Sequence, residues 1–168
     1  MRSNAAAATS CWDSIRHHAA CGAQARAQDQ DTDLTTILAI PGSWRSGSYN
    51  LALARAAQAL APAGCTVELA SIAAIPVYDG DSEAAQGLPA PVAELKDRIA
   101  AADALRLVTP EYNNSVPGPL KNAIDWLSRP ASDLARVFGD KPTGLIGASP
   151  GPGGTRLAQA AWLPVLRL

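Results

Sequence analysis

The chain has 168 residues, of which 48% are hydrophobic and 17% are charged, and its formal net charge is −1. These values suit one folded domain and argue against a nucleic-acid-binding protein, which would carry a strong positive charge. No apolar run approaches the roughly 18 residues that cross a membrane, and three cysteines, which cannot all pair with one another, favour a reducing, cytoplasmic compartment.

Residues 1–33 differ from the rest of the chain, because they contain few apolar side chains other than alanine and end in a polar stretch. We expect them to form a disordered extension ahead of a single domain at 34–168. An organelle transit peptide is the less favoured alternative, suggested by arginines and few acids. Four side chains here have the composition of metal ligands, but the segment shows no sign of a fold, so we predict no metal site. They are Cys11, His17, His18 and Cys21.

From residue 34 onward, strand and helix patterns alternate. Short apolar runs predict strands, and amphipathic segments bounded by proline or glycine predict helices. In chain order we predict a strand at 34–40, a helix at 48–61, a strand at 65–70, a loop at 71–88, a helix at 89–102, a strand at 103–110, a helix at 119–130, a strand at 142–149 and a last helix from Thr155. The alternation predicts a doubly wound α/β domain whose parallel sheet is covered on both faces.

Parallel sheets of this kind bind ligands beyond the carboxyl ends of their strands. The candidate site therefore lies in the loops 41–50, 110–118 and 148–154. The phosphate-binding motif of nucleotide hydrolases and the glycine fingerprint of dinucleotide-binding domains are both absent from the first of these loops.

The first loop, PGSWRSGSYN, has the composition of a phosphate-binding turn. Glycine and serine before a helix leave backbone N–H groups free at the positive end of the helix dipole. Ser43, Ser48 and Asn50 add neutral polar groups, and Arg45 adds a charge whose forked geometry matches phosphate oxygens. A simple connecting turn is the alternative.

The second loop, PEYNNSVPGP, is unusually polar for its place in the fold. Glu111, Asn113 and Asn114 carry carboxylate or amide groups, and Tyr112 carries a flat ring. These groups suit a planar heteroaromatic ligand with donors and acceptors on its rim. A rigid turn is the alternative, since asparagine tolerates left-handed backbone and proline starts helices, and the loop taken alone favours it.

The third loop contains GASPG at 147–151, which matches the nucleophile elbow of serine hydrolases. A hydrolase triad needs an acid and a histidine after the serine, but neither follows Ser149, and the only histidines are His17 and His18. We therefore interpret the loop as a glycine turn whose backbone approaches a ligand closely. A serine hydrolase is the weaker alternative.

Together the three loops resemble those of the NADPH-dependent FMN reductase family, a branch of the flavodoxin-like fold. The matching stretches are GSWRSGSYN (42–50), TPEYNNSVPGPLKNAIDWLSRP (109–130) and GASPGPGGTR (147–156), within a resemblance that covers about residues 34–166. It implies non-covalently bound FMN that is reduced by NADPH or NADH and passes electrons to small acceptors such as quinones, azo compounds or chromate. It also implies a homo-oligomer, a dimer or a tetramer. A non-catalytic flavodoxin-like module that binds FMN is the alternative.

The resemblance also implies a role for each loop residue by its position. The residues that would hold the FMN phosphate are Ser43, Arg45, Ser48 and Asn50. Those that would line the ribityl and isoalloxazine side are Pro110, Glu111, Tyr112 and Asn113. Those that would border the other edge of the ring are Ser149, Gly151 and Gly154. No catalytic side chain and no metal is implied, because the flavin carries the hydride chemistry.

The end of the chain departs from the family pattern, which continues with a fifth strand and a closing helix. We therefore expect a sheet of four strands in which the strand at 142–149 is an unprotected edge that favours self-association. We also expect Pro164 to break the last helix and part of its apolar surface to lack a cover. That surface consists of Leu157, Trp162, Leu163, Val165 and Leu166.

Overall fold

The computed structural model of the chain describes residues 34–167, so the expected extension and its candidate metal ligands lie outside the described residues. Four parallel strands form one sheet in the order β2-β1-β3-β4. They are β1 (Thr35–Pro41), β2 (Cys65–Leu69), β3 (Ala104–Val108) and β4 (Thr143–Ile146). Within the described residues β4 pairs only with β3, so it is an edge strand as expected.

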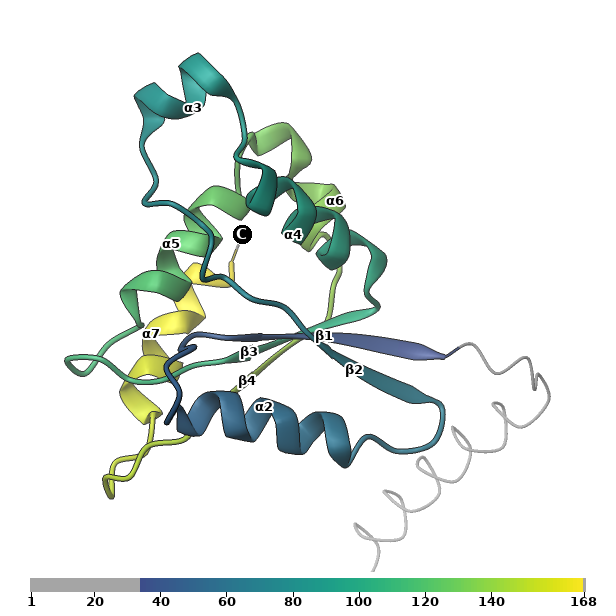
Figure 1. Cartoon of the computed structure of the whole chain (residues 1–168), viewed down its shortest axis with the longest axis vertical. Helices are drawn as coiled ribbons and strands as arrows, with labels where there is room; N and C mark the ends of the chain where they lie inside the picture. Colours follow the sequence, from purple (N-terminus) through teal and green to yellow (C-terminus); the bar gives the residue numbers. More distant parts are fainter. Residues whose placement is uncertain (1–33, 168) are drawn as a thin grey trace, which may run out of the picture. The chain divides into compact units, whose positions relative to one another are not determined.

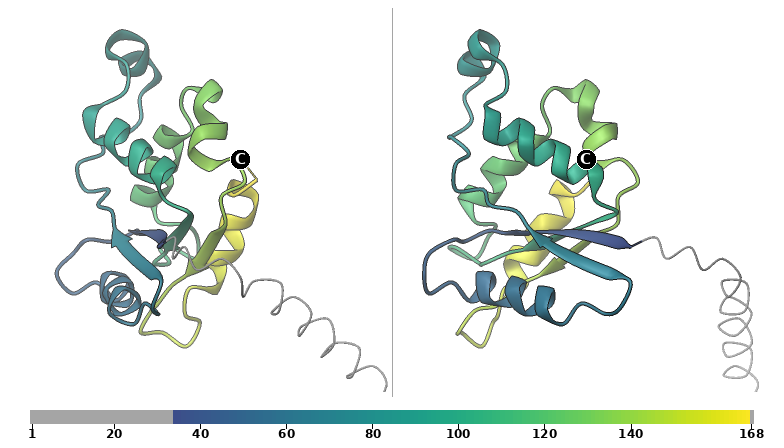
Figure 2. Two further views of the ribbon diagram at one scale, coloured as in Figure 1. Left: turned by 90° about the vertical axis from the view of Figure 1, so that its right-hand side faces the viewer. Right: turned by 45° about the vertical axis from the view of Figure 1, so that its right-hand side comes forward.

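Helices cover both faces of the sheet, which confirms the doubly wound α/β prediction (Figures 1 and 2). Helix α2 (Tyr49–Ala59) lies on one face, and the other face carries α4 (Ala90–Ala101), α5 (Gly118–Leu127) and α7 (Arg156–Val165). Three short helices complete the description: α3 (Gly80–Gln86), the 3-10 helix η1 (Ala131–Asp133) and α6 (Leu134–Phe138). No helix among residues 34–167 is long and apolar enough to cross a membrane.

The alternation of side chains along β1 divides the core into two clusters. Leu38 and Ile40 are buried in the larger cluster, with side chains of α4, α5 and α7. Ala39 points the other way and packs against Ala54 of α2, both fully buried. Two alanines in contact let α2 approach the sheet closely, and the start of α2 therefore lies beside the carboxyl end of β1.

The predicted elements agree with the structure except near prolines and in short polar segments. Helix α5 ends at Leu127 rather than at residue 130, because a residue before proline disfavours helical backbone and Pro130 follows closely. Helix α3 lies inside the predicted loop 71–88, and η1 and α6 lie where no helix was predicted. These segments are too short for a clear helical period to emerge.

Helix α7 differs from expectation at Pro164 and has a partly exposed apolar surface as expected. Pro164 lies inside the helix without breaking it, because it is one residue from the end and the N–H of Leu166 still donates to the carbonyl of Trp162 (3.0 Å). Trp162 is the fully buried part of the apolar surface, and its indole N–H donates to the hydroxyl of Thr109 (2.9 Å). Leu157 and Leu163 remain exposed. The buried tryptophan ties α7 to the end of β3.

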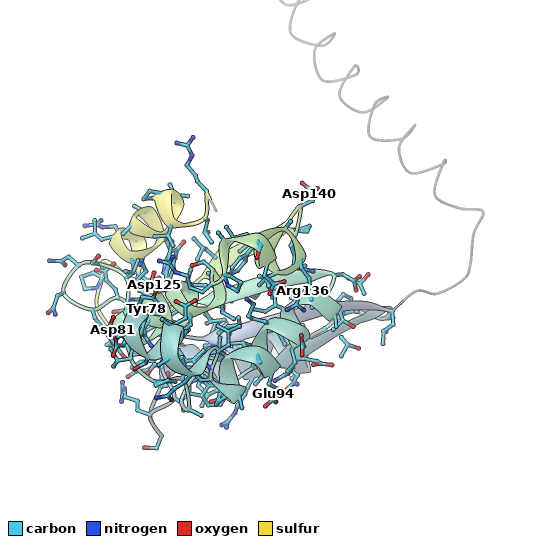
Figure 3. The ribbon with its side chains drawn as sticks, turned by 90° about the horizontal axis from the view of Figure 1, so that it is seen from above. Tyr78, Asp81, Glu94, Asp125, Arg136 and Asp140 are labelled. Atoms are coloured by element: carbon cyan, nitrogen blue, oxygen red, sulfur yellow. The ribbon has the colours of Figure 1, made fainter. Side chains whose placement is uncertain are left out.

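An ionic network joins α4 to the segment that follows α5. The ammonium group of Lys96, which is almost fully buried, binds the carboxylate of Asp133 at 2.8 Å. Arg136, labelled in Figure 3, binds the same carboxylate at 2.6 Å and Asp97 at 2.9 Å. The hydrogen bond from Arg136, and then that from Lys96, hold the pKa of Asp133 well below its usual range. These ion pairs hold η1 and α6 against α4.

Candidate functional site

The three predicted loops meet at the carboxyl edge of the sheet, where they surround a small hollow. We call it the Arg45 hollow. Its volume is about 100 Å³. The residues that line it are Ser43, Arg45, Ser48, Tyr49, Asn50, Pro110, Glu111, Tyr112, Ala148, Ser149 and Pro150. Eight of these were singled out from the sequence, while Asn113, Gly151 and Gly154 do not line the hollow.

The first loop ends in a capped helix start. The hydroxyl of Ser48 accepts a hydrogen bond from the N–H of Leu51 (3.1 Å), and the backbone N–H of Ser48 donates to the carbonyl of Arg45 (3.0 Å). This is the N-cap arrangement that serine favours. The hydroxyl of Ser48 is thus engaged in the cap, and the N–H groups of the first turn of α2 have no acceptor inside the helix. Tyr49 and Asn50, the first two residues of that turn, line the Arg45 hollow.

Arg45 is the only cationic side chain that lines this hollow in the part of the chain that the structure describes. It is exposed, and it forms no ion pair with any residue from 34 to 167. An unpaired guanidinium beside a helix N-terminus creates a positive environment, which favours a phosphate or another anion.

Asn50 holds the third loop against the first. Its side-chain amide donates to the carbonyl of Ala148 (3.0 Å), and its side-chain oxygen accepts the N–H of the same residue (2.9 Å). Asn50 is almost fully buried. The amide oxygen and one amide N–H are therefore engaged by protein backbone, which gives Asn50 a positioning role. Its role as a phosphate ligand stays a prediction.

Glu111 is also engaged by protein backbone. One oxygen of its carboxylate accepts the N–H groups of Leu157 (2.9 Å) and Ala158 (3.0 Å) in the first turn of α7. Thr155, at the N-cap position, makes no side-chain hydrogen bond there. The carboxylate of Glu111 thus caps α7 from another loop, which complements the positive end of the helix dipole. It fixes the second loop to the third.

The tip of the second loop is a tight turn, as the alternative interpretation predicted. Tyr112 and Ser115 pair through two backbone hydrogen bonds of 3.2 and 3.1 Å. Between them Asn113 and Asn114 have φ of 51° and 59°. Two consecutive left-handed residues are typical of a type I′ turn, in which asparagine is favoured. Tyr112 lines the hollow, whereas Asn113, inside the turn, does not.

The glycines of the third loop differ from one another in how closely the protein packs around them and in φ. A Cβ atom at Gly147 would collide with the hydroxyl of Thr155 and the carbonyl of Thr109, so close packing requires glycine there. A Cβ atom at Gly151 would meet only the hydroxyl of Ser149, at 3.8 Å, and Gly151 does not have a positive φ, so the protein itself does not require glycine there. Gly154 does have a positive φ, 59°.

The serine hydrolase alternative finds no support in the third loop. Ser149 does not have the positive φ of a strained elbow, and its hydroxyl accepts the N–H of Gly151 (3.2 Å). Both histidines lie outside the described residues. Within residues 34–167 no three potential metal ligands gather in one place.

Sequence reasoning missed three residues that line the Arg45 hollow, namely Tyr49, Ala148 and Pro150. Each is a direct neighbour of a residue that was singled out. The position of the loops therefore predicted these residues, whereas their residue types did not.

Comparison with known proteins identifies the arrangement. The sequence model of the family described as NADPH-dependent FMN reductase matches residues 35–168. A protein from Pseudomonas aeruginosa named NAD(P)H-dependent FMN reductase is 48% identical over 128 residues, which cover 76% of this chain and 67% of that protein. A quinone reductase from Escherichia coli is 52% identical over 94 residues, which cover 55% of this chain and 50% of that protein.

The folds also agree. The solved structure of FerB, a flavoenzyme NAD(P)H:(acceptor) oxidoreductase from Paracoccus denitrificans, is 41% identical and superposes with a TM-score of 0.72, covering 79% of this chain and 71% of that one. The chain thus spans between half and about two thirds of the length of these two curated relatives.

Proposed function

Because the chain belongs to the NADPH-dependent FMN reductase family, we propose that it binds FMN at the Arg45 hollow and uses NAD(P)H to reduce small acceptors such as quinones. The observation that carries this proposal is the meeting of an unpaired arginine, a helix N-terminus and two polar loops at one edge of the sheet. The hollow itself is smaller than the roughly 300 Å³ of a typical ligand pocket, so it suits one end of a ligand.

The residues present fit the phosphate end of FMN. The guanidinium of Arg45 and the free N–H groups in the first turn of α2 would bind the phosphate oxygens. Ser43 and Ser149 offer hydroxyl groups at the rim. When bound, FMN supplies the ring that takes a hydride from NAD(P)H and delivers electrons to the acceptor. The protein binds and orients that ring through the second and third loops.

The relatives support particular acceptors. Several of the curated relatives are named for quinones, among them the Escherichia coli quinone reductase and a 2-hydroxy-1,4-benzoquinone reductase from Burkholderia sp. We therefore propose quinones as the first acceptor class to test, with azo compounds and chromate after them. A homo-oligomer, a dimer or a tetramer, and a cytoplasmic location are part of the same proposal. The absence of a nucleic-acid partner remains a prediction from the charge.

The decisive experiment is to release and identify the flavin from purified protein, and then to add NADPH or NADH without oxygen. We expect the released flavin to be FMN. We also expect NADPH or NADH to abolish the flavin absorbance at about 450 nm, and a quinone to restore it. FMN that NAD(P)H does not bleach would instead identify the alternative, a binding module without turnover. Protein that retains no flavin and does not bind added FMN would contradict both.

A further inference from the structure

A second and larger hollow lies beside the Arg45 hollow. We call it the Trp44 hollow. Its volume is about 320 Å³, and it shares Ser43 and Tyr112 with its neighbour. It forms where the loop after β1 faces the loop after β2 and the start of α5. The residues that line it are Gly42, Ser43, Trp44, Ile72, Ala73, Ile75, Tyr112, Pro119 and Asn122.

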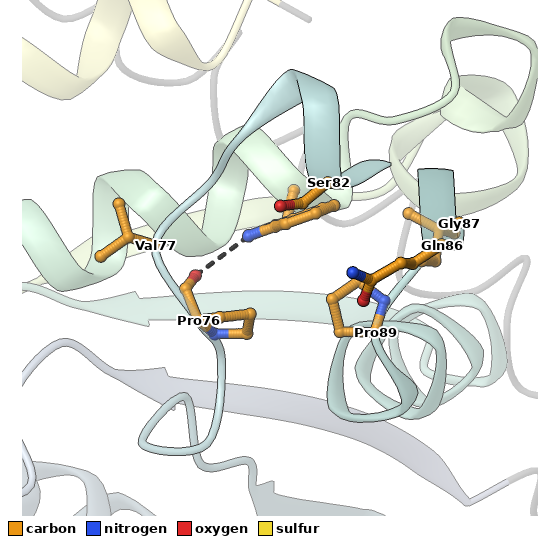
Figure 4. Close-up of a pocket in the computed structure, with 8 residues that line it drawn as sticks. Pro76, Val77, Ser82, Gln86, Gly87 and Pro89 are labelled. Carbon is orange, nitrogen blue, oxygen red and sulfur yellow. Dashed lines mark hydrogen bonds between the residues drawn. The ribbon is translucent and has the colours of Figure 1, made fainter. Parts of the chain in front are cut away.

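The wall of the Trp44 hollow is held in place from behind. The side-chain oxygen of Asn122 accepts the N–H of Tyr78 (2.8 Å), and its amide donates to the carbonyl of Pro76 (2.8 Å). The same carbonyl accepts the indole N–H of Trp126 (3.0 Å), drawn as the dashed line in Figure 4. The loop after β2 is thus clamped to α5, and the amide of Asn122 is engaged on both ends. The hollow is therefore formed before a ligand arrives, which lowers the ordering cost of binding.

The lining carries no charged side chain and is mostly apolar, although Ser43 and Asn122 add polar groups. Trp44 and Tyr112 supply aromatic rings, and Ile72, Ala73 and Ile75 supply aliphatic surface. The indole N–H of Trp44 is buried, and it has no acceptor among the described residues. A buried donor without an acceptor is costly, and a small shift of the indole ring towards the hollow would let a carbonyl oxygen of the ligand supply one. An uncharged apolar wall disfavours anions, which lose hydration without gaining a partner.

We propose that the Trp44 hollow binds the acceptor and selects planar, uncharged molecules that carry a carbonyl, such as naphthoquinones, over small anions such as chromate. This rests on the proposed function, because the electrons come from FMN bound next to Ser43 and Tyr112. The quinone gains a hydride, two electrons and one proton, from the reduced flavin and a second proton from solvent, and it leaves as the hydroquinone. Oxidation of one NAD(P)H to NAD(P)⁺ restores the reduced flavin.

Steady-state kinetics with two acceptors test the assignment. Trp44→Leu removes the ring and the N–H, and Trp44→Phe removes the N–H but keeps an aromatic ring. With a naphthoquinone we expect KM to rise about tenfold in the first variant and up to about fivefold in the second, the usual value of one hydrogen bond. With ferricyanide, a small anion that needs no apolar hollow, the rate of each variant stays within about twofold of the parent.

A second pair of variants avoids any loss of core packing. Ala73 and Ala74 are neighbouring exposed alanines, but only Ala73 lines the Trp44 hollow. Ala73→Leu adds volume to the hollow and raises KM for the naphthoquinone, while Ala74→Leu is the matched control and leaves KM unchanged. If both substitutions have the same effect, the hollow does not bind the acceptor.

Three further readouts separate this inference from its alternatives. The dissociation constant of FMN and the rate of flavin bleaching by NAD(P)H stay unchanged in the Ala73 and Trp44 variants. A loss of FMN affinity as large as the rise in KM would assign the hollow to the flavin. A change of oligomer size in Ala73→Leu, measured by light scattering, would assign it to a second copy of the chain. Parent protein that binds no FMN, or that NAD(P)H does not bleach, would refute the proposed function instead.

Discussion

The carboxylate of Glu111 offers the sharpest test of how the site is assembled. It accepts two backbone N–H groups at the start of α7, at 2.9 and 3.0 Å, from a loop 46 residues earlier in the chain. A helix cap contributes about 1 kcal/mol, and a negative charge at a helix N-terminus contributes about 0.3–1 kcal/mol. Glu111→Ala should therefore lower the free energy of unfolding by about 1.5 kcal/mol. The loss affects global stability, because Trp162 anchors α7 in the main core.

Urea denaturation of the flavin-free protein measures this change. With a slope of about 2 kcal/mol per molar, the midpoint of Glu111→Ala falls by about 0.7 M. Glu111→Gln keeps an oxygen that can accept the same N–H groups and should lose only the charge contribution, below about 1 kcal/mol. Glu94→Ala is the matched control, since Glu94 is an exposed acid on α4, and its effect should stay within about 0.5 kcal/mol. An unchanged midpoint in Glu111→Ala would refute the capping role.

Four further outcomes follow from the same geometry. Arg45→Ala should weaken FMN about 10- to 100-fold, as expected for one charge-assisted hydrogen bond, and leave riboflavin affinity unchanged in fluorescence titrations. Asn50→Ala should weaken FMN and riboflavin alike, because it releases the third loop. Gly147→Ala should destabilise the protein by about 1–3 kcal/mol in urea through overpacking, while Gly151→Ala changes stability by less than about 0.5 kcal/mol. The lowered pKa of Asp133 stabilises the fold above the usual carboxyl pKa and ceases to do so as pH falls towards the lowered value, so the stability difference between the parent and Asp133→Asn should shrink between pH 7 and pH 3.

The sequence was sufficient for the sheet and its loops, because their signals are local. The apolar run that became β1 and the Pro-Gly pair after it lie within ten residues of each other. The same holds for α2, where Ser48 supplies the start and Gly64, with φ of 79°, lies in the turn that follows its end. Such patterns depend on neighbours in the chain, so residue order alone reveals them.

The roles of the polar loop residues could not be obtained in this way. Asn50 bonds to a residue 98 positions away, and Glu111 bonds to a helix that begins 45 positions later. An asparagine in a phosphate-type loop and a glutamate in a flavin-type loop both suggest ligands by residue type. Only the fold shows that backbone groups already occupy them. The requirement for glycine at Gly147 was hidden in part for the same reason, since Thr109, in a distant segment, crowds it together with the nearby Thr155.

The polar groups around the Arg45 hollow therefore fall into two sets with different consequences for binding. One set forms hydrogen bonds to the protein backbone and so positions α2, α7 and the loops before any ligand arrives. It consists of Ser48, Asn50 and Glu111. Arg45 forms no ion pair with any described residue, so its charge is available to the ligand. The residues bound to backbone determine whether a flavin ring fits in the site. The charge of Arg45 determines how much the phosphate adds to the binding affinity. This separation is why riboflavin should respond to the loss of Asn50 but not to the loss of Arg45.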